Sequence, residues 1–486
     1  MSLRKEAVIG FSWSFVEGVV GKLIQLFVGI YIARMLSPEA FGIVGISLII
    51  INIIQPLVES GLTAALIQKQ DAKEIHNSTV FYYNLFIALI IYAGLYFSAK
   101  SISIYFQETE LTSVIKVLGL TLIISAFGAV QNAILFKKLN FKVISKASIA
   151  SNVISGAAGI YLAYLGYGVW SLVYRNLLQL LLYNIFITVV GRWIPSFIFS
   201  FKELKLMFSF GFHLLLSSII NAVFGQGAQF VIAKFYSPIS LGFYSRAELM
   251  GMAIPTTLSN LIEKVSFPIL SKIQNNDEKL KSGLSKLIQT GMVLSFFLVG
   301  LIYVESDKLV LFLLGEDWNT TAEYLEIVCF AFVLHPLHSI NLSILKVKAR
   351  TDYYLRVELI KKITLIPLII LGVFSSINSL LWLLVLHSVI SYIINTIYSN
   401  KVINYGLRSQ LIDLLKPLIV ALIPIIVIHL IKDYFTMGVL WKLAIEFSIA
   451  TIIFVTLAKV FRLEFITFLT QLIRNKIDTS NKTIPS

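Results

Sequence analysis

The sequence Ala33-Arg34-Met35-Leu36-Ser37-Pro38-Glu39-Ala40-Phe41-Gly42 recurs later in the chain in a related form. The second copy reads Ala233-Lys234-Phe235-Tyr236-Ser237-Pro238-Ile239-Ser240-Leu241-Gly242, a shift of 200 residues from position 33 to position 233. Each copy follows an apolar run long enough to cross a membrane, at 11–35 and at 207–235. The two runs are therefore predicted to be counterparts in two related halves.

The match between the halves continues inside these apolar runs, where small and polar residues recur at one-turn spacing on one face. The first set is Gly18, Gly21, Gln25 and Gly29, and the shift of 200 leads to Ser218, Asn221, Gly225 and Gln229. A weaker echo relates 132–137 to 341–346. Two related halves around a central path are the common plan of secondary transporters.

The composition makes the lipid bilayer the solvent of this chain. Hydrophobic residues form 57% of it and charged residues 14%, and the mean hydropathy is +0.84, which lies outside the range of soluble domains. The net charge of +14 comes from basic clusters between apolar runs, so it does not indicate nucleic acid. Cys329 is the single cysteine, which excludes a disulfide within the chain.

We expect an all-α integral membrane protein of about 14 transmembrane helices, in two pseudo-symmetric six-helix lobes plus two C-terminal helices. The predicted spans are 11–35, 43–66, 79–98, 113–136, 147–165, 169–190, 207–235, 247–270, 285–304, 322–345, 359–375, 379–399, 416–431 and 439–460. The predicted domains are an N-terminal lobe 1–191, a cytoplasmic link 192–206, a C-terminal lobe 207–400, appended helices 401–462 and a cytoplasmic tail 463–486. The polar end of that tail, 475–486, is predicted to be disordered.

Basic residues gather in alternate connectors, and this pattern predicts the orientation. Roughly 30 of the 40 Lys and Arg residues fall on one side of the membrane. The positive-inside rule makes that side cytoplasmic and places both termini there. Residues 1–6 lead into an amphipathic helix rather than a cleavable signal, so we expect them to be retained.

Three elements resemble the polysaccharide-exporting flippases of the multidrug/oligosaccharidyl-lipid/polysaccharide exporter superfamily, which include O-antigen, colanic acid and teichuronic acid exporters. They are 33–42, then 59–68 at the end of the second span, and 311–318 ahead of the tenth. The resemblance implies a flippase that moves an undecaprenyl-diphosphate-linked oligosaccharide across a bacterial inner membrane by alternating access, for surface polysaccharide synthesis. Its implied partners are this lipid-linked cargo, membrane lipids, and the polysaccharide polymerase and export machinery.

Such a cargo needs a hydrophilic cavity for its sugars, positive charge for its diphosphate and a lateral opening for its polyprenyl tail. A base inside a membrane helix is costly, and it is therefore a functional candidate. Lys22, which lies beside the polar stripe, is the first candidate for the diphosphate contact. The further cavity candidates are Gln25, Arg34, Asn221, Gln229, Lys234, Arg175 and Arg246.

Each cavity candidate has a competing interpretation. Snorkelling to the headgroups accounts for Arg34 and Lys234 at the outer ends of their helices, and interfacial anchoring accounts for Arg175 and Arg246. For the stripes the alternative is close helix packing through small residues. It accounts for the glycines of the first stripe but not for the Gln and Asn side chains, which need partners or water.

Glu17, Glu59 and Glu263 are candidate sites for a proton or sodium ion that drives the cycle. Glu59 shares a predicted helical face with Asn52, Gln55 and Thr63. The alternative for each acid is an ion pair with a neighbouring base, and for Glu263 a local pair with Lys264 or a position at the membrane surface. No cofactor is predicted beyond such an ion.

We predict no catalytic residue and no metal site. His335 and His338 are three residues apart, but Pro336 between them and the lack of a third ligand nearby argue against a metal. No phosphate-binding glycine loop or nucleophile elbow is present. A membrane polysaccharide polymerase is therefore the weaker alternative, because no outer connector is long enough to hold its site.

Two transporter functions remain as alternatives, a drug/cation antiporter and a flippase of the peptidoglycan lipid precursor, both of the same superfamily. Twelve helices would favour the antiporter. About 14 helices, together with cavity candidates that are basic, favour a lipid-diphosphate cargo.

Overall fold

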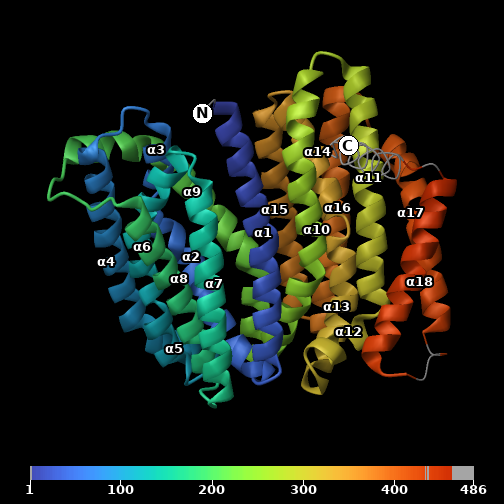
Figure 1. Ribbon diagram of the computed structural model, residues 1–486, viewed down its shortest axis with the longest axis horizontal. Helices are drawn as coiled ribbons and strands as arrows, with labels where there is room; N and C mark the ends of the chain where they lie inside the picture. The colour runs from blue at the N-terminus through green and yellow to red at the C-terminus, as the bar shows by residue number, and fades with distance from the viewer. Residues whose placement is uncertain (1–2, 433, 435–436, 462, 464–486) are drawn as a thin grey trace, which may run out of the picture. The chain divides into compact units, whose positions relative to one another are not determined.

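The computed structural model describes residues 3–432, 434, 437–461 and 463, and the regular elements among these residues are all helical (Figure 1). Twelve segments of this part are long and apolar enough to cross a membrane. Two more helices are as long but more polar, α10 (Pro238–Lys272) and α15 (Thr351–Val373). The all-α membrane fold is therefore confirmed, with a helix count of about 14. The predicted disorder of 475–486 falls outside the described residues.

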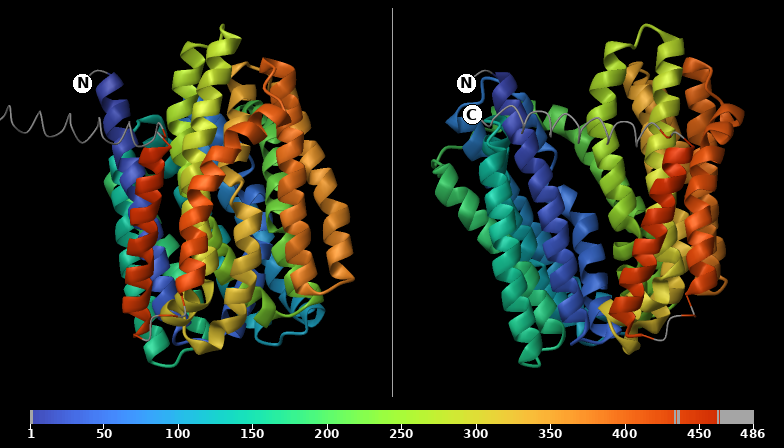
Figure 2. Two further views of the ribbon diagram at one scale, coloured as in Figure 1. Left: turned by 90° about the vertical axis from the view of Figure 1, so that its right-hand side faces the viewer. Right: turned by 45° about the vertical axis from the view of Figure 1, so that its right-hand side comes forward.

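The chain packs as two compact units, Met1–Ser245 and Arg246–Ser486. The helices of the first unit are α1 (Leu3–Ala33), α2 (Pro38–Glu59), α3 (Leu62–Gln68), α4 (Glu74–Phe106), α5 (Leu111–Leu118), α6 (Leu120–Lys137), α7 (Phe141–Tyr164), α8 (Val169–Gly191), α9 (Phe201–Phe235) and the start of α10. Within this unit α1 packs along α7, and α9 packs on α2, α3 and α4 (Figure 2). The link 192–206 was predicted to separate two lobes of matching helices. This division into lobes stays a prediction.

The second unit contains the rest of α10 and the remaining helices. They are α11 (Asp277–Val304), α12 (Ser306–Leu313), α13 (Asn319–Phe332), α14 (His335–Val347), α15, α16 (Ile377–Ile403), α17 (Leu407–Ile431) and α18 (Val439–Val460). α11 packs on α17, and α17 packs on α18. The rings of Phe297 and Phe454 stack with their centroids 4.0 Å apart in this apolar core. The two C-terminal helices are thus part of the packed core of the second unit.

Three predicted spans are interrupted in the structure. The second span ends at Ser60 and Gly61, whose positive φ angles of 52° and 67° close α2 before α3 begins. The fourth is divided at Gly119 into α5 and α6. The tenth is divided between α13 and α14 ahead of Pro336, which lacks a backbone N–H. There Ser295 Oγ donates to the carbonyl of Val333 at 2.7 Å.

The repeated motif forms a reciprocal crossing of α2 and α10. Ser37 and Ser237 each cap the helix that follows, accepting from the backbone N–H of the residue three positions on. A Cβ added to Gly42 would lie 1.8 Å from the Pro238 carbonyl oxygen, and one added to Gly242 would lie 1.9 Å from that of Pro38. Each glycine therefore makes room for the start of the other helix.

Buried amides hold α14, α16 and α17 together inside the second unit. Asn341 and Gln410 exchange hydrogen bonds of 3.0 and 2.8 Å, and Ser399 donates to Asn341 Oδ1 at 2.8 Å. Asn132, the counterpart of Asn341 in the weaker echo, accepts from the Tyr183 hydroxyl at 3.1 Å. The repeated asparagine thus bonds to a neighbouring helix in both units.

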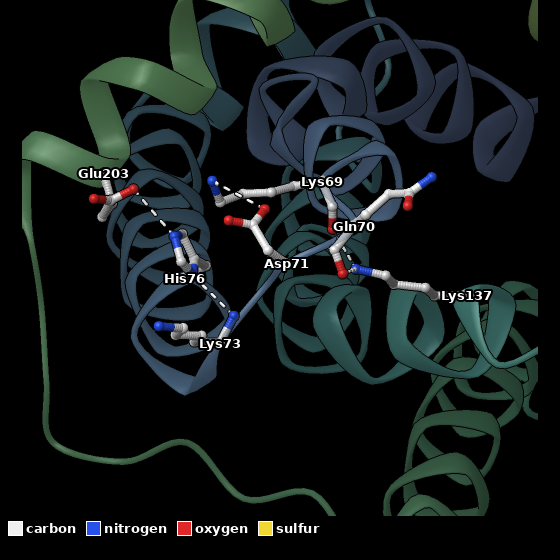
Figure 3. A network of polar contacts seen from close by, with 7 residues as sticks. All are labelled: Lys69, Gln70, Asp71, Lys73, His76, Lys137 and Glu203. Carbon is white, nitrogen blue, oxygen red and sulfur yellow. Dashed lines mark hydrogen bonds and ion pairs between the residues drawn. The ribbon is translucent and has the colours of Figure 1, made fainter.

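The link 192–200 is fastened to the first turn of α4. Trp193 Nε1 donates to Glu74 at 2.9 Å. Figure 3 shows His76 between Glu203 of α9 and Lys73, which precedes α4. Its Nε2 lies 3.0 Å from Glu203 Oε2, and its Nδ1 accepts from the Lys73 N–H at 2.9 Å. Because Nδ1 accepts, Nε2 carries the proton and donates to Glu203. The link is therefore held against its own unit.

Candidate functional site

α1 has two exposed faces of opposite character. Leu23, Phe27 and Tyr31 are 51%, 61% and 55% exposed and follow one another at one-turn spacing, as expected of a lipid-facing surface. Lys22 and Gln25 are also exposed. They point to the other side of the helix, because successive residues are about 100° apart.

α9 repeats this arrangement. Leu216 and Val223 are 49% and 44% exposed on one side of the helix. Asn221 is exposed, and Gln229 is half-buried, on the other side. α1 and α9 therefore each carry an exposed apolar face opposite polar side chains.

The glycines of the two stripes do not serve close helix packing over most of their length. A Cβ added to Gly18, Gly21 or Gly225 would meet no heavy atom of the described chain within 4 Å. The packing interpretation of Gly18 and Gly21 is therefore wrong for this structure. Farther along α1 the helix does pack closely, since Val28 fills the space above Gly156 of α7.

Arg34 and Lys234 end equivalent helices in different surroundings. Arg34 is exposed. Lys234 Nζ lies 3.8 Å from the centroid of the Tyr105 ring and also donates to the Tyr105 carbonyl oxygen. The end of α4 thus holds the cation of Lys234.

The other two arginine candidates lie inside helices. Arg175 is half-buried in α8, with its aliphatic stem against Gly159 of α7, and its Nε is buried without a hydrogen-bond partner in the described chain. Arg246 was predicted at the entry of its helix, but α10 already begins at Pro238. It therefore lies more than two turns inside α10.

Two of the candidate acids occupy different surroundings in the first unit. Glu17 is half-buried. Glu59 is exposed at the end of α2, where Gln55 Nε2 lies 3.4 Å from its Oε1 and 2.9 Å from Ser125 Oγ. The predicted face that joined Glu59 to Thr63 is wrong, because the left-handed residues after Glu59 separate α2 from α3.

Glu263 pairs across helices, and the two histidines of the tenth span have separate partners. Glu263 Oε1 lies 2.6 Å from Lys346 Nζ of α14, in an exposed ion pair. His335 Nδ1 is 2.8 Å from Ser259 Oγ, whereas His338 Nε2 is 3.2 Å from Ser388 Oγ. Pairing thus accounts for Glu263, and the two imidazoles bond to different helices.

The sequence did not predict an apolar groove along α11 and α17 in the second unit. Its two adjoining parts have volumes of about 740 and 260 Å³, and Phe296 and Leu418 line both. Arg408 is the charged residue of the lining. Such a groove is formed by ordinary apolar residues of neighbouring helices, with Cys329 and Phe330 of α13 completing its smaller part, so hydropathy alone gives no sign of it.

The sequence also did not predict an ion cluster in the second unit. Lys308 lies between Glu305 and Glu446, with Nζ 2.8 Å from a carboxylate oxygen of each. Glu446 stands out in the sequence as an acid in an apolar run, but Glu305 and Lys308 follow the predicted end of the ninth span. Only packing brings α18 to them.

Comparison with known proteins assigns the chain to a family by sequence. A family model described as polysaccharide biosynthesis protein matches residues 31–323. The teichuronic acid biosynthesis protein TuaB of Bacillus subtilis (strain 168) is 26% identical over 459 residues, covering 92% of this chain and 93% of that protein. The lipopolysaccharide biosynthesis protein WzxC of Escherichia coli (strain K12) is 26% identical over 379 residues, 76% of either chain.

Solved structures share the fold at low sequence identity. A lipid II flippase MurJ in an inward closed conformation has a TM-score of 0.77 and 17% identity, covering 93% of this chain and 98% of its own. An inward-facing MATE family multidrug transporter of the MOP superfamily has a TM-score of 0.62 and 16% identity, covering 79% and 94%. The fold is thus that of MOP-superfamily transporters.

Proposed function

The chain belongs to the family of polysaccharide biosynthesis proteins whose model matches residues 31–323, and we propose that it is a flippase for a lipid-linked oligosaccharide in a bacterial inner membrane. The names of its relatives support this assignment. They include TuaB, WzxC and a succinoglycan biosynthesis transport protein, ExoT, of Rhizobium meliloti (strain 1021), which is 26% identical over 289 residues. The proposed cargo is an oligosaccharide on undecaprenyl diphosphate.

The observation that carries the proposal is the exposed polar face of α1. Lys22 and Gln25 lie opposite an exposed apolar face, at a depth where hydrocarbon would leave an ammonium unsolvated. A helix with both faces exposed suits a position between lipid and a water-filled cavity. The open surroundings of Gly18 and Gly21 agree with this position. Lys22 is the proposed contact to the cargo diphosphate.

Asn221 and Gln229 on α9 are the proposed sugar contacts of the equivalent face. Amide side chains both donate and accept hydrogen bonds, which suits hydroxyl-rich cargo. Arg34 and Arg246 are proposed to add positive charge along the same route. Lys234 is a weaker candidate than the sequence suggested, since Tyr105 already holds its ammonium group.

The apolar groove of the second unit is proposed to hold the polyprenyl tail. Its lining along α11 and α17 is apolar apart from Arg408, which lies at the start of α17. An arginine at the end of an apolar groove fits a lipid that carries phosphate at one end of a hydrocarbon chain.

The proposed orientation follows from the positive-inside rule, with both termini in the cytoplasm and a polysaccharide polymerase acting on the outer side. A proton or sodium gradient is the proposed source of energy, and Glu17 and Glu59 are the remaining candidates among the predicted acids. Glu263 is set aside because its pair with Lys346 already accounts for its charge.

Deletion of the gene tests the proposed function. Lipid-linked repeat units are expected to accumulate on the cytoplasmic face while the surface polysaccharide is lost, and the wild-type gene should restore export. Unchanged surface polysaccharide together with altered resistance to cationic drugs would favour the antiporter alternative. Accumulation of the peptidoglycan lipid precursor would instead favour a flippase of that precursor.

The same export assay tests the groove. Leu418→Trp places a large ring in both parts of the groove and should reduce export. Ile419→Trp is the matched control, because Ile419 is 46% exposed on α17 and does not line the groove. Equal export by the two variants at equal membrane levels would exclude the groove from transport.

A further inference from the structure

Glu305, Lys308 and Glu446, here called the outer triad, join three elements of the second unit. Glu305 lies between α11 and α12, Lys308 is in α12, and Glu446 is two turns into α18. Lys308 Nζ is 2.8 Å from Glu305 Oε2 and 2.8 Å from both oxygens of Glu446. One ammonium group therefore serves two carboxylates.

Both carboxylates are buried. Glu305 is 1% exposed and Glu446 is 0% exposed. With every group ionised the outer triad carries one excess negative charge in a medium that solvates it poorly. Glu305 Oε1 has no hydrogen-bond partner in the described chain. The arrangement thus has one charge too many and one acceptor without a donor.

Among the described residues, Lys308 is the cation that pairs with the two carboxylates. Asp307 of α12 is exposed, and Glu326 of α13 accepts from Ser306 Oγ at 3.0 Å. Other titratable groups on or next to the helices around the outer triad include Tyr303, Glu323, Cys329, His429, Lys432 and Lys442. None of them forms an ion pair with the outer triad within the described residues.

A proton on either carboxylate would cancel the excess negative charge and would supply the missing hydrogen-bond donor. The new O–H bond cancels the excess charge, and the O–H group can donate to the neighbouring carboxylate while Lys308 stays an ammonium ion. Burial raises the pKa of Glu305 above its usual range, Lys308 opposes this rise only in part, and Glu446 adds to it.

We propose that Glu305 and Glu446 form a binding site for a single proton, and that the bound proton holds α18 against α12. Loss of the proton leaves two buried carboxylates competing for Lys308 and weakens the contact between these helices. The site does not depend on the cargo or on the proposed flippase activity.

The sign of the pH dependence follows from this arrangement. In the unfolded chain Glu305 has the ordinary carboxyl pKa of about 4.3. Because burial raises the pKa of Glu305 in the folded chain, stability is full at low pH and is lost as pH rises through that raised pKa. The unfolding midpoint of the purified full-length protein in detergent should fall by at least about 2 °C across that range.

Glu446→Gln is the informative variant, because the amide keeps the size of the side chain and can donate to Glu305 without a titrating proton. It should abolish this fall in the unfolding midpoint. Asp307→Asn is the matched control. It removes an exposed acid next to Lys308 in α12, and it should leave the fall in the unfolding midpoint unchanged. An equal pH dependence in wild type and Glu446→Gln would overturn the proposal.

Infrared spectroscopy of the unmodified protein gives a second test that does not require a variant to fold. A protonated carboxylic acid has a carbonyl band distinct from that of a carboxylate, and titration in heavy water should show one such band disappear as pH rises. The band should be absent from Glu446→Gln or from Glu305→Gln. If the wild type shows no protonated acid at a pH above the ordinary carboxyl range, there is no such site, whatever the protein transports.

Discussion

At the scale of single residues, Lys22 is the group on which the proposed mechanism depends most. It lies eleven residues before the end of α1 at Ala33, about 16 Å along the helix at 1.5 Å per residue. That places it near the middle of a hydrocarbon layer about 30 Å thick. Its exposed position opposite Phe27 gives a reason for tolerating a charge there.

Substitution of Lys22 should therefore separate charge from structure. Lys22→Ala is expected to lower the rate of export by about 10-fold or more, since a charge-assisted contact contributes roughly 1.5–3 kcal/mol. Lys22→Arg keeps the charge and should retain most of the activity. Export would be measured at equal membrane levels, with Lys100→Ala, an exposed lysine of α4, as the control. Full export by Lys22→Ala would remove this residue from the mechanism.

At the scale of helices, the crossing of α2 and α10 is the structural consequence of the repeated motif. Proline at the first helical position and serine as cap start each helix at the same point. Because the two starts pack against each other, each glycine faces the other helix's proline carbonyl. The repeat therefore appears in the structure as a contact, and not only as two similar turns.

Gly42→Ala should be strongly destabilising for this reason. The added methyl group would lie 1.8 Å from a backbone oxygen, which no side-chain movement can relieve, so a cost of about 1–3 kcal/mol or more is expected. Gly242→Ala should behave alike. The measurement is the thermal unfolding midpoint of the purified protein.

Gly94→Ala provides the comparison for these variants. Gly94 lies inside α4, and a Cβ there would meet no heavy atom of the described chain within 4 Å. The thermal unfolding midpoint of Gly94→Ala should stay the same or rise slightly, because alanine is more favourable than glycine in a helix by up to about 1 kcal/mol. Equal effects at Gly42 and Gly94 would contradict the crossing.

At the scale of the whole molecule, the transmembrane orientation rests on the distribution of basic residues. Lys137 ends α6 and Lys138 follows it in a basic connector, whereas Glu108 and Glu110 lie in the connector between α4 and α5. Burial raises the pKa of the Glu108 carboxyl, and the charges of Glu39 and Glu110 add to this effect. The connector after α6 carries a basic residue and the one between α4 and α5 carries none, and this difference in Lys and Arg is what the positive-inside rule uses.

Cysteine labelling of intact cells tests this orientation. Cys329 is the single native cysteine and is 2% exposed, so Cys329→Ala gives a simple background. Glu110→Cys should react with a membrane-impermeant thiol reagent, and Lys138→Cys should react only after the cells are opened. The reverse pattern would place both termini outside.

The helices and the repeat can be predicted from the sequence alone. Helices as long as α4 and α18 could be predicted because length and hydropathy are local properties, and both follow from the thickness of the bilayer. The polar stripe of α1 could be found because helical spacing brings Lys22 and Gln25 to one side. The break after Glu59 was missed, since Gly61 inside an apolar run resembles the many glycines of uninterrupted membrane helices.

Which distant residues meet depends on how the helices pack in the folded chain. Glu305 and Glu446 are far apart in the sequence of the second unit, and they share Lys308 because α18 packs against α12. The reciprocal contact of Gly42 and Pro238 depends in the same way on how two helices cross. Hydropathy and spacing describe each helix alone, whereas these contacts depend on the side chains that neighbouring helices present to one another at close packing.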